Sequence, residues 1–146
     1  MAKVITIERV VTVDRPVETV FAYLSDFETT VEWEPGTVST VKVSGDGGVG
    51  TKYANTSSLA GRQTEIEYVV QQFEPAQLFQ VRGENRSMNA LGTLTLRPSG
   101  DGTEVTYRAE VEFKGVTRLL EPLLKPQLKK LADDTEQGMH KALQKL

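Results

Sequence analysis

The segment VTVDRPVETVFAYLSD, from Val11 to Asp26, joins the end of a predicted β-strand to an amphipathic helix. Residues 4–13 are rich in β-branched side chains and alternate loosely, which predicts the strand. Pro16 suits the first turn of a helix, because its missing N–H group has no partner there in any case, and we expect Asp14 or Arg15 as the N-cap. Apolar residues then recur at helical spacing, so the chain turns from strand to helix within this segment.

The middle of the chain, residues 37–113, has the pattern of an antiparallel sheet. A second short helical turn is expected at 27–31, just before it. Gly-rich turns at 44–48 and 98–102 separate strands in which apolar and polar residues alternate, most cleanly over 105–113. Such alternation gives each strand one apolar and one polar face. We therefore expect a sheet that is solvated on one side and covered on the other.

The C-terminal segment is the predicted cover for this sheet. Beyond Gly115, apolar residues recur at helical spacing and charged residues occupy the other faces, with interruptions allowed near Pro122 and Pro126. The helix from Pro126 onward has about 20 residues and is therefore roughly 30 Å long. That length is sufficient to lie across a strongly curved sheet.

Composition excludes several classes of function. The 146 residues carry a net charge of −3, contain no cysteine and contain one histidine. Thiolate chemistry, disulfides and most zinc sites are therefore excluded, and we expect neither a metal nor a cofactor. A pI near 5.3 disfavours a nucleic-acid binder. No apolar run is long enough for stable membrane insertion, and the N-terminal residues lack a signal-peptide pattern, so we expect a cytoplasmic protein.

The segment from Val11 to Asp26, together with Trp33, the turn at 47–51 and the final helix, resembles the START-like or Bet v 1-like helix-grip superfamily. The likeness is to its polyketide cyclase/dehydrase and lipid-transport (SRPBCC) group and covers essentially the whole chain, as one domain over residues 1–146. The resemblance implies an α+β fold: a curved seven-stranded antiparallel sheet wrapped around a long C-terminal helix, with two short helices between the first two strands.

The resemblance also implies an internal pocket that holds a small hydrophobic molecule, such as a lipid or a polyketide-like compound, for transport or sequestration. Strand parity and the tail stripe place candidate ligand contacts on the covered face. Each of these residues also has an alternative role as core packing, but a tightly packed core would rarely include Asn55, Ser57 and Thr64 together. The candidates are Arg9, Trp33, Tyr53, Asn55, Ser57, Thr64, Tyr68, Phe79, Val81, Met88, Tyr107, Ala109, Leu124, Leu128 and Leu131.

Two of these candidates have specific alternatives. Strict alternation places Arg9 on the inner face, where it would anchor a ligand carboxylate. We favour the alternative that it turns outward or pairs with a glutamate on the adjacent strand. Trp33 follows the short helices, and it either caps the ligand or fixes that loop to the sheet.

A binding protein is the favoured interpretation, with two alternatives. A polyketide cyclase or aromatase would use a tyrosine or arginine to polarise a carbonyl group. The inner face lacks an evident acid/base pair, so we assign no catalytic residue. A protein-interaction module of the co-chaperone type would be favoured by a solid core without a pocket. The sequence leaves the monomer or homodimer state open.

Overall fold

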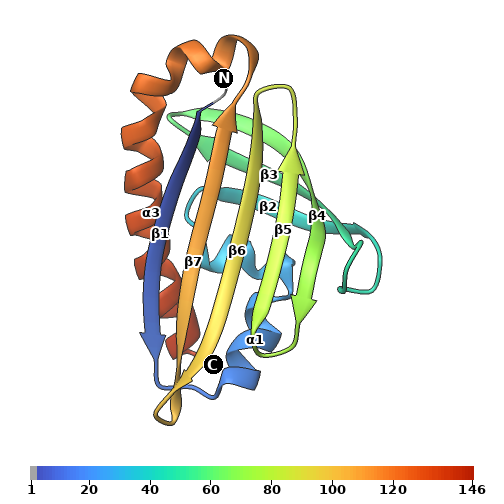
Figure 1. Ribbon diagram of the computed structural model, residues 1–146, viewed down its shortest axis with the longest axis vertical. Helices are drawn as coiled ribbons and strands as arrows, with labels where there is room; N and C mark the ends of the chain where they lie inside the picture. The colour runs from blue at the N-terminus through green and yellow to red at the C-terminus, as the bar shows by residue number, and fades with distance from the viewer. Residues whose placement is uncertain (1–2) are drawn as a thin grey trace.

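The computed structural model describes residues 3–146. The elements follow the predicted order, with a strand, short helices, six further strands and a long terminal helix (Figure 1). Their bounds are β1 Val4–Val13, α1 Val17–Leu24, the 3₁₀ turn η1 Phe27–Thr29, α2 Thr30–Trp33, β2 Thr37–Ser44, β3 Lys52–Leu59, β4 Arg62–Glu74, β5 Leu78–Glu84, β6 Met88–Ser99, β7 Gly102–Phe113, the 3₁₀ turn η2 Gly115–Leu120 and α3 Glu121–Gln144.

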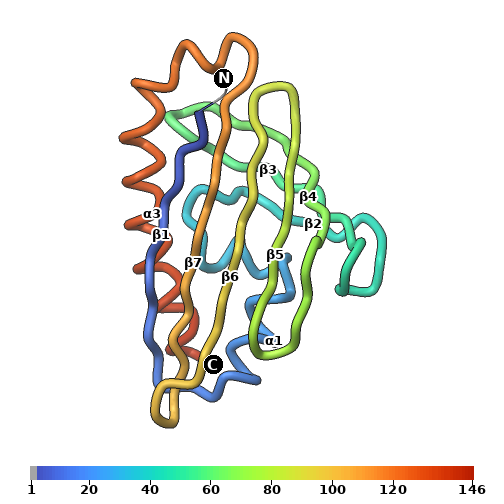
Figure 2. Tube along the Cα trace, viewed as in Figure 1, coloured from blue at the N-terminus to red at the C-terminus, as the bar shows by residue number. Residues whose placement is uncertain are grey.

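The strands form one antiparallel sheet in the order β1-β7-β6-β5-β4-β3-β2. This confirms the predicted helix-grip architecture, including its seven-stranded sheet. The sheet curves so that β2 and β3 lie behind β6 and β7, and α3 runs along β1 from the β5–β6 turn end of the molecule to the α1 end (Figure 2). One face of the sheet is therefore enclosed by the curve, and the other faces outward.

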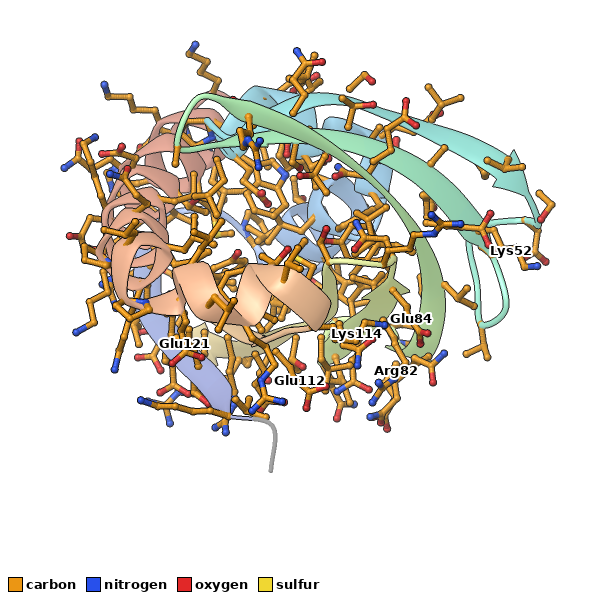
Figure 3. All side chains as sticks on the ribbon, turned by 90° about the horizontal axis from the view of Figure 1, so that it is seen from above. Lys52, Arg82, Glu84, Glu112, Lys114 and Glu121 are labelled. Atoms are coloured by element: carbon orange, nitrogen blue, oxygen red, sulfur yellow. The ribbon has the colours of Figure 1, made fainter. Side chains whose placement is uncertain are left out.

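Most polar residues of the strands lie on the outer face, as alternation predicts. Arg82, Glu84 and Glu112 point away from the enclosed space (Figure 3). Lys114 Nζ lies 3.5 Å from Glu84 Oε1 on this outer surface. The enclosed face is left to apolar side chains and to the few polar ones described below.

The first helix begins differently from our expectation. Its N-cap is Pro16, in extended conformation, and no side chain caps the helix, so the prediction of Asp14 or Arg15 as N-cap was wrong. Arg15 instead donates to the carbonyl oxygens of Gln144 and Leu146, at the end of α3. The Arg15 side chain, which we expected to cap α1, thus connects the start of α1 to the end of α3.

The terminal helix begins earlier than predicted, at Glu121, and has 24 residues. It is therefore about 36 Å long. Pro122 falls in its first turn, where the missing N–H is tolerated, and Pro126 lies inside the helix. Close contact fixes its C-terminal half to α2, because a Cβ atom at Gly138 would lie 2.5 Å from the Trp33 carbonyl oxygen.

The buried apolar residues form two clusters. The larger gathers around α1, α2 and the strands that they cover, and includes Trp33, Tyr53 and Phe79. The smaller lies at the other end, where Ile5, Ile7, Val111, Phe113, Leu128 and Ala132 pack together. Residues of both clusters line a common space between the sheet and α3.

Candidate functional site

A cavity of about 220 Å³ lies between the enclosed face of the sheet and α3. This volume is more than ten times the roughly 10–15 Å³ that one water molecule needs, so it is not a packing defect. Strands β4 to β7 supply much of its wall, and α3 closes it with Leu124, Leu128 and Leu131. The walls are mainly apolar, with a few polar side chains among them, which is the usual character of a small-molecule site.

Most of the candidate residues line this cavity. They come from β3 to β7, from α2 and from the terminal helix, as strand parity and helical spacing predict. Those in the lining are Trp33, Ser57, Thr64, Tyr68, Phe79, Val81, Met88, Tyr107, Ala109, Leu124, Leu128 and Leu131.

Arg9, predicted as a ligand contact, lies outside the cavity lining. Its guanidinium group lies 2.9 Å from Asp133 Oδ1 and 3.8 Å from Glu136 Oε1, both on α3. The ion pair that we favoured is present, but its partners belong to the helix and not to the adjacent strand. The reason is that the polar edge of α3, and not the cavity, faces this part of β1.

Tyr53 and Asn55 also lie outside the lining, because η1 and α2 cover the inner face of β3 at this end. Tyr53 is 1% exposed and packs edge to face on Phe27, with ring centroids 5.4 Å apart. The Asn55 amide donates to Thr40 Oγ1 at 2.9 Å and accepts from Ser57 Oγ at 2.6 Å. Its hydrogen-bonding groups are thus used within the protein.

The polar residue that sequence reasoning missed is Glu34. It follows α2 directly and lines the cavity. The residue as a whole is half-buried, but its carboxyl group lies in water-poor surroundings, and burial raises its pKa from 4.5 to about 7. The hydroxyl of Thr37 partly offsets this rise. Glu34 lies between α2 and β2, where the sequence follows neither the helical nor the strand period. The sequence therefore did not predict the direction of its side chain.

Tyr68 of β4 and Tyr107 of β7 lie close enough to Glu34 to interact with its charge. Burial raises the pKa of both phenols, and the Glu34 charge is the next cause in each case. Neither hydroxyl has a hydrogen-bond partner within residues 3–146. The cavity therefore brings the Glu34 carboxyl together with two phenol groups, which sequence reasoning had not combined as an acid/base set.

Trp33 fixes its segment to the sheet and also lines the cavity. Its indole Nε1 donates to Thr29 Oγ1 at 3.1 Å, and its ring lies edge to face with Tyr107, with centroids 6.3 Å apart. These contacts fix α2 to the sheet. The same side chain, which is 2% exposed, also lines the cavity.

One end of the cavity is formed by η2, the β3–β4 hairpin and the β5–β6 turn, which lie together at the top of Figure 1. Arg62 and Leu120 line this end and are exposed. Leu119 and Leu123, beside it, are 81% and 72% exposed. We therefore place the cavity entrance between the hairpin and η2.

The described residues offer no obvious place for a metal ion. Over 3–146, no three His, Cys, Asp or Glu side chains are grouped so that they could hold one. None of the helices in the same range is both long and apolar enough to cross a membrane.

The sequence matches the family model described as polyketide cyclase / dehydrase and lipid transport over residues 4–145. No curated protein matches the chain. Among solved structures, the Zhui aromatase/cyclase from Streptomyces sp. R1128 is 12% identical, with a TM-score of 0.82 over 96% of this chain and 93% of that one.

Two further structures show the same fold. A START superfamily protein from Mycobacterium smegmatis is 22% identical, with a TM-score of 0.71 over 95% of this chain and 94% of that one. Norcoclaurine synthase from Thalictrum flavum is 18% identical, with a TM-score of 0.63 over 93% of this chain and 86% of that one. At these identities the likeness shows the fold, and the functional argument depends on the cavity.

Proposed function

Because the chain belongs to the polyketide cyclase / dehydrase and lipid transport family, we propose that it binds a small, largely apolar molecule in the cavity between the sheet and α3. The observation that carries this proposal is the unfilled space between the two apolar clusters. Native cores close such spaces, since a void forfeits dispersion contacts and costs stability. A space of this size is consistent with selection for an occupant.

The apolar walls would supply most of the affinity. A molecule that hides about 250 Å² of apolar surface gains roughly 6 kcal/mol from burial, before the costs of association are subtracted. Because about 6 kcal/mol corresponds to a Kd of tens of micromolar and association costs reduce the gain further, small probes should bind at tens of micromolar or more weakly unless polar groups add to the affinity. The leucines of α3 and the rings of Phe79 and Tyr68 are the surfaces that such a molecule would contact.

Filling the cavity tests this proposal. Ala109 lines the cavity from β7, and Ala109→Phe would place a ring inside it. Thr106→Phe adds the same ring to the same strand outside the lining, and is the matched control. We expect the protein, stripped of ligand by organic extraction, to bind the neutral dye Nile red, Thr106→Phe to retain binding and Ala109→Phe to lose it while keeping its circular dichroism spectrum. Equal binding by both variants would place the dye elsewhere and refute the proposal.

One observation favours a second candidate, a cyclase or aromatase. The Glu34 carboxyl, with a pKa near 7, is suited to accept and return a proton at neutral pH, and the Tyr68 and Tyr107 phenols would donate to a substrate carbonyl. Turnover of a poly-β-keto thioester mimic, followed by absorbance, tests it. Loss of turnover in Glu34→Gln and Tyr107→Phe supports catalysis; absence of turnover in the unaltered protein dismisses it.

A further inference from the structure

The cavity contains a carboxyl group without a protein cation to balance it. Glu34 takes part in no ion pair within the described part of the chain. Among the described residues, Arg62 supplies the single cation in the lining, and it lies at the exposed entrance. When Glu34 ionises, its charge therefore remains unneutralised in a poorly hydrated space, which is unfavourable.

The elements packed around Glu34 supply no compensating charge. The face that α3 turns to the cavity carries Leu128, Leu131 and Ala132. None of the charged residues of this helix is in the cavity lining, and two of them pair with other residues: Asp133 with Arg9, and Lys130 with Asp134.

The strands around Glu34 are likewise without a balancing cation. Strand β3 contributes serine hydroxyls, and β4 contributes Tyr68 in addition to Arg62. From β7 come Tyr107 and Glu110, and the Glu110 carboxylate is held by Arg108 at 2.8 Å. The titratable groups that face Glu34 are therefore the two phenols, which are neutral.

Aromatic rings surround the same carboxyl. Trp33 precedes Glu34 in the chain and meets Tyr107 edge to face, with ring centroids 6.3 Å apart, and Tyr68 and Tyr107 line the same cavity as Glu34. Phe27 packs on Tyr68 at 5.2 Å and extends the aromatic wall. The faces of such rings attract cations, and tryptophan does so most strongly. A carboxylate among aromatic rings is a site with the chemistry to recognise an organic cation.

We infer that the occupant of the cavity carries a protonated amine on an apolar body, and that the ammonium group pairs with the Glu34 carboxylate beside the rings of Trp33, Tyr68 and Tyr107. This inference rests on the proposed function, since it names the chemical class of the molecule that the cavity binds. The apolar body occupies the space between the sheet and the leucines of α3. A ligand carboxylate of the same size is disfavoured, because it meets Glu34 as a like charge.

The selectivity depends on pH with a definite sign. Without ligand, the carboxyl has a pKa of about 7, so it is mostly neutral at pH 5.5 and mostly ionised at pH 8. An alkyl amine keeps its charge across this range, as a lysine side chain does. The preference for an amine over an alcohol of equal length therefore grows from pH 5.5 to pH 8.

The test uses three probes that differ only in the head group: octylamine, 1-octanol and octanoate, each measured by displacement of Nile red. At pH 8 we expect octylamine to bind about tenfold more tightly than 1-octanol, and octanoate to bind more weakly than 1-octanol. In Glu34→Gln the ratio of amine to alcohol affinity should fall to about one. Glu32→Gln, which removes a carboxylate two residues earlier, in α2 and outside the lining, should retain the ratio.

The outcomes separate the two proposals. If 1-octanol binds but octylamine binds no more tightly to the unaltered protein than to Glu34→Gln, the amine inference is wrong and the binding function stands. If octanoate binds most tightly and Arg62→Gln abolishes that preference, the entrance arginine selects the ligand and the inference is overturned. If none of the probes binds or displaces Nile red, the binding function itself fails.

The unaltered protein alone supplies a further test, because an amine-to-alcohol ratio that does not grow between pH 5.5 and pH 8 overturns the inference.

Discussion

Replacing Glu34 by glutamine should make the ligand-free protein more stable at pH 8. Folding raises the pKa of the Glu34 carboxyl. At pH values between its unfolded-state and folded-state pKa, the carboxyl is therefore protonated in the folded protein and ionised in the unfolded protein. Over that interval the folded state holds more protons, so stability falls as pH rises. The loss begins near 4.5, the ordinary pKa, and is complete above about 7.

The magnitude follows from the size of the shift. A rise from 4.5 to about 7 corresponds to roughly 3 kcal/mol at 1.4 kcal/mol per pKa unit. Glu34 is half-buried, so screening by solvent reduces this figure, and we expect a destabilisation of about 2 kcal/mol at pH 8. Glutamine has nearly the same shape and carries no charge, so Glu34→Gln should recover most of it. In a domain of this size, a gain of about 2 kcal/mol in the free energy of unfolding corresponds to a rise of about 5 °C in Tm.

Urea denaturation followed by circular dichroism at pH 4.5 and pH 8 measures this effect. The ligand-free unaltered protein should lose stability relative to Glu34→Gln as pH rises, and the two should be closely matched at pH 4.5. Glu32→Gln is the control, because Glu32 is exposed and accepts a hydrogen bond from the Tyr23 hydroxyl outside the cavity. If Glu34→Gln gains no more stability at pH 8 than at pH 4.5, Glu34 is well hydrated and the reasoning is refuted.

Three further substitutions test the packing around the site, each by thermal melting. Gly138→Ala should cost about 2 kcal/mol, because its Cβ would lie 2.5 Å from the Trp33 carbonyl oxygen; an unchanged Tm would show that α3 and α2 are less close. Asn55→Leu should cost about 1–3 kcal/mol, because it removes the buried bond to Thr40 Oγ1 and takes away the acceptor of the Ser57 hydroxyl, and a neutral effect would contradict the described network. Arg9→Met should cost less than about 1 kcal/mol and leave Nile red binding intact, since the ion pair with Asp133 is partly exposed and outside the cavity; loss of dye binding would contradict that placement.

Alternation along the strands predicted the larger part of the cavity wall. Tyr68, Met88 and Tyr107 lie on the face that their positions in β4, β6 and β7 require. The same rule, however, gives only the face and not what covers it. Tyr53 and Asn55 are on the inner face of β3 where η1 and α2 cover it, so they became core residues.

Glu34 marks the other limit of sequence reasoning. Between the end of α2 and the start of β2, neither the helical nor the strand period applies, so a side chain there has no predictable direction. Its role arises from tertiary contacts with two strands that are far away in the chain. Three residues that looked unrelated in the sequence, Glu34, Tyr68 and Tyr107, line one cavity because the sheet curves back over α2.

The most direct test of the cavity is methyl NMR during a titration with 1-octanol. Leu124, Leu128 and Leu131 line the cavity, whereas Leu119 and Leu123 are exposed beside its entrance. We predict saturable shifts at the three lining leucines and at Met88, with smaller changes at the two exposed ones. Shifts confined to Leu119 and Leu123, or none at all up to the solubility of the alcohol, would contradict an apolar molecule held between the sheet and α3.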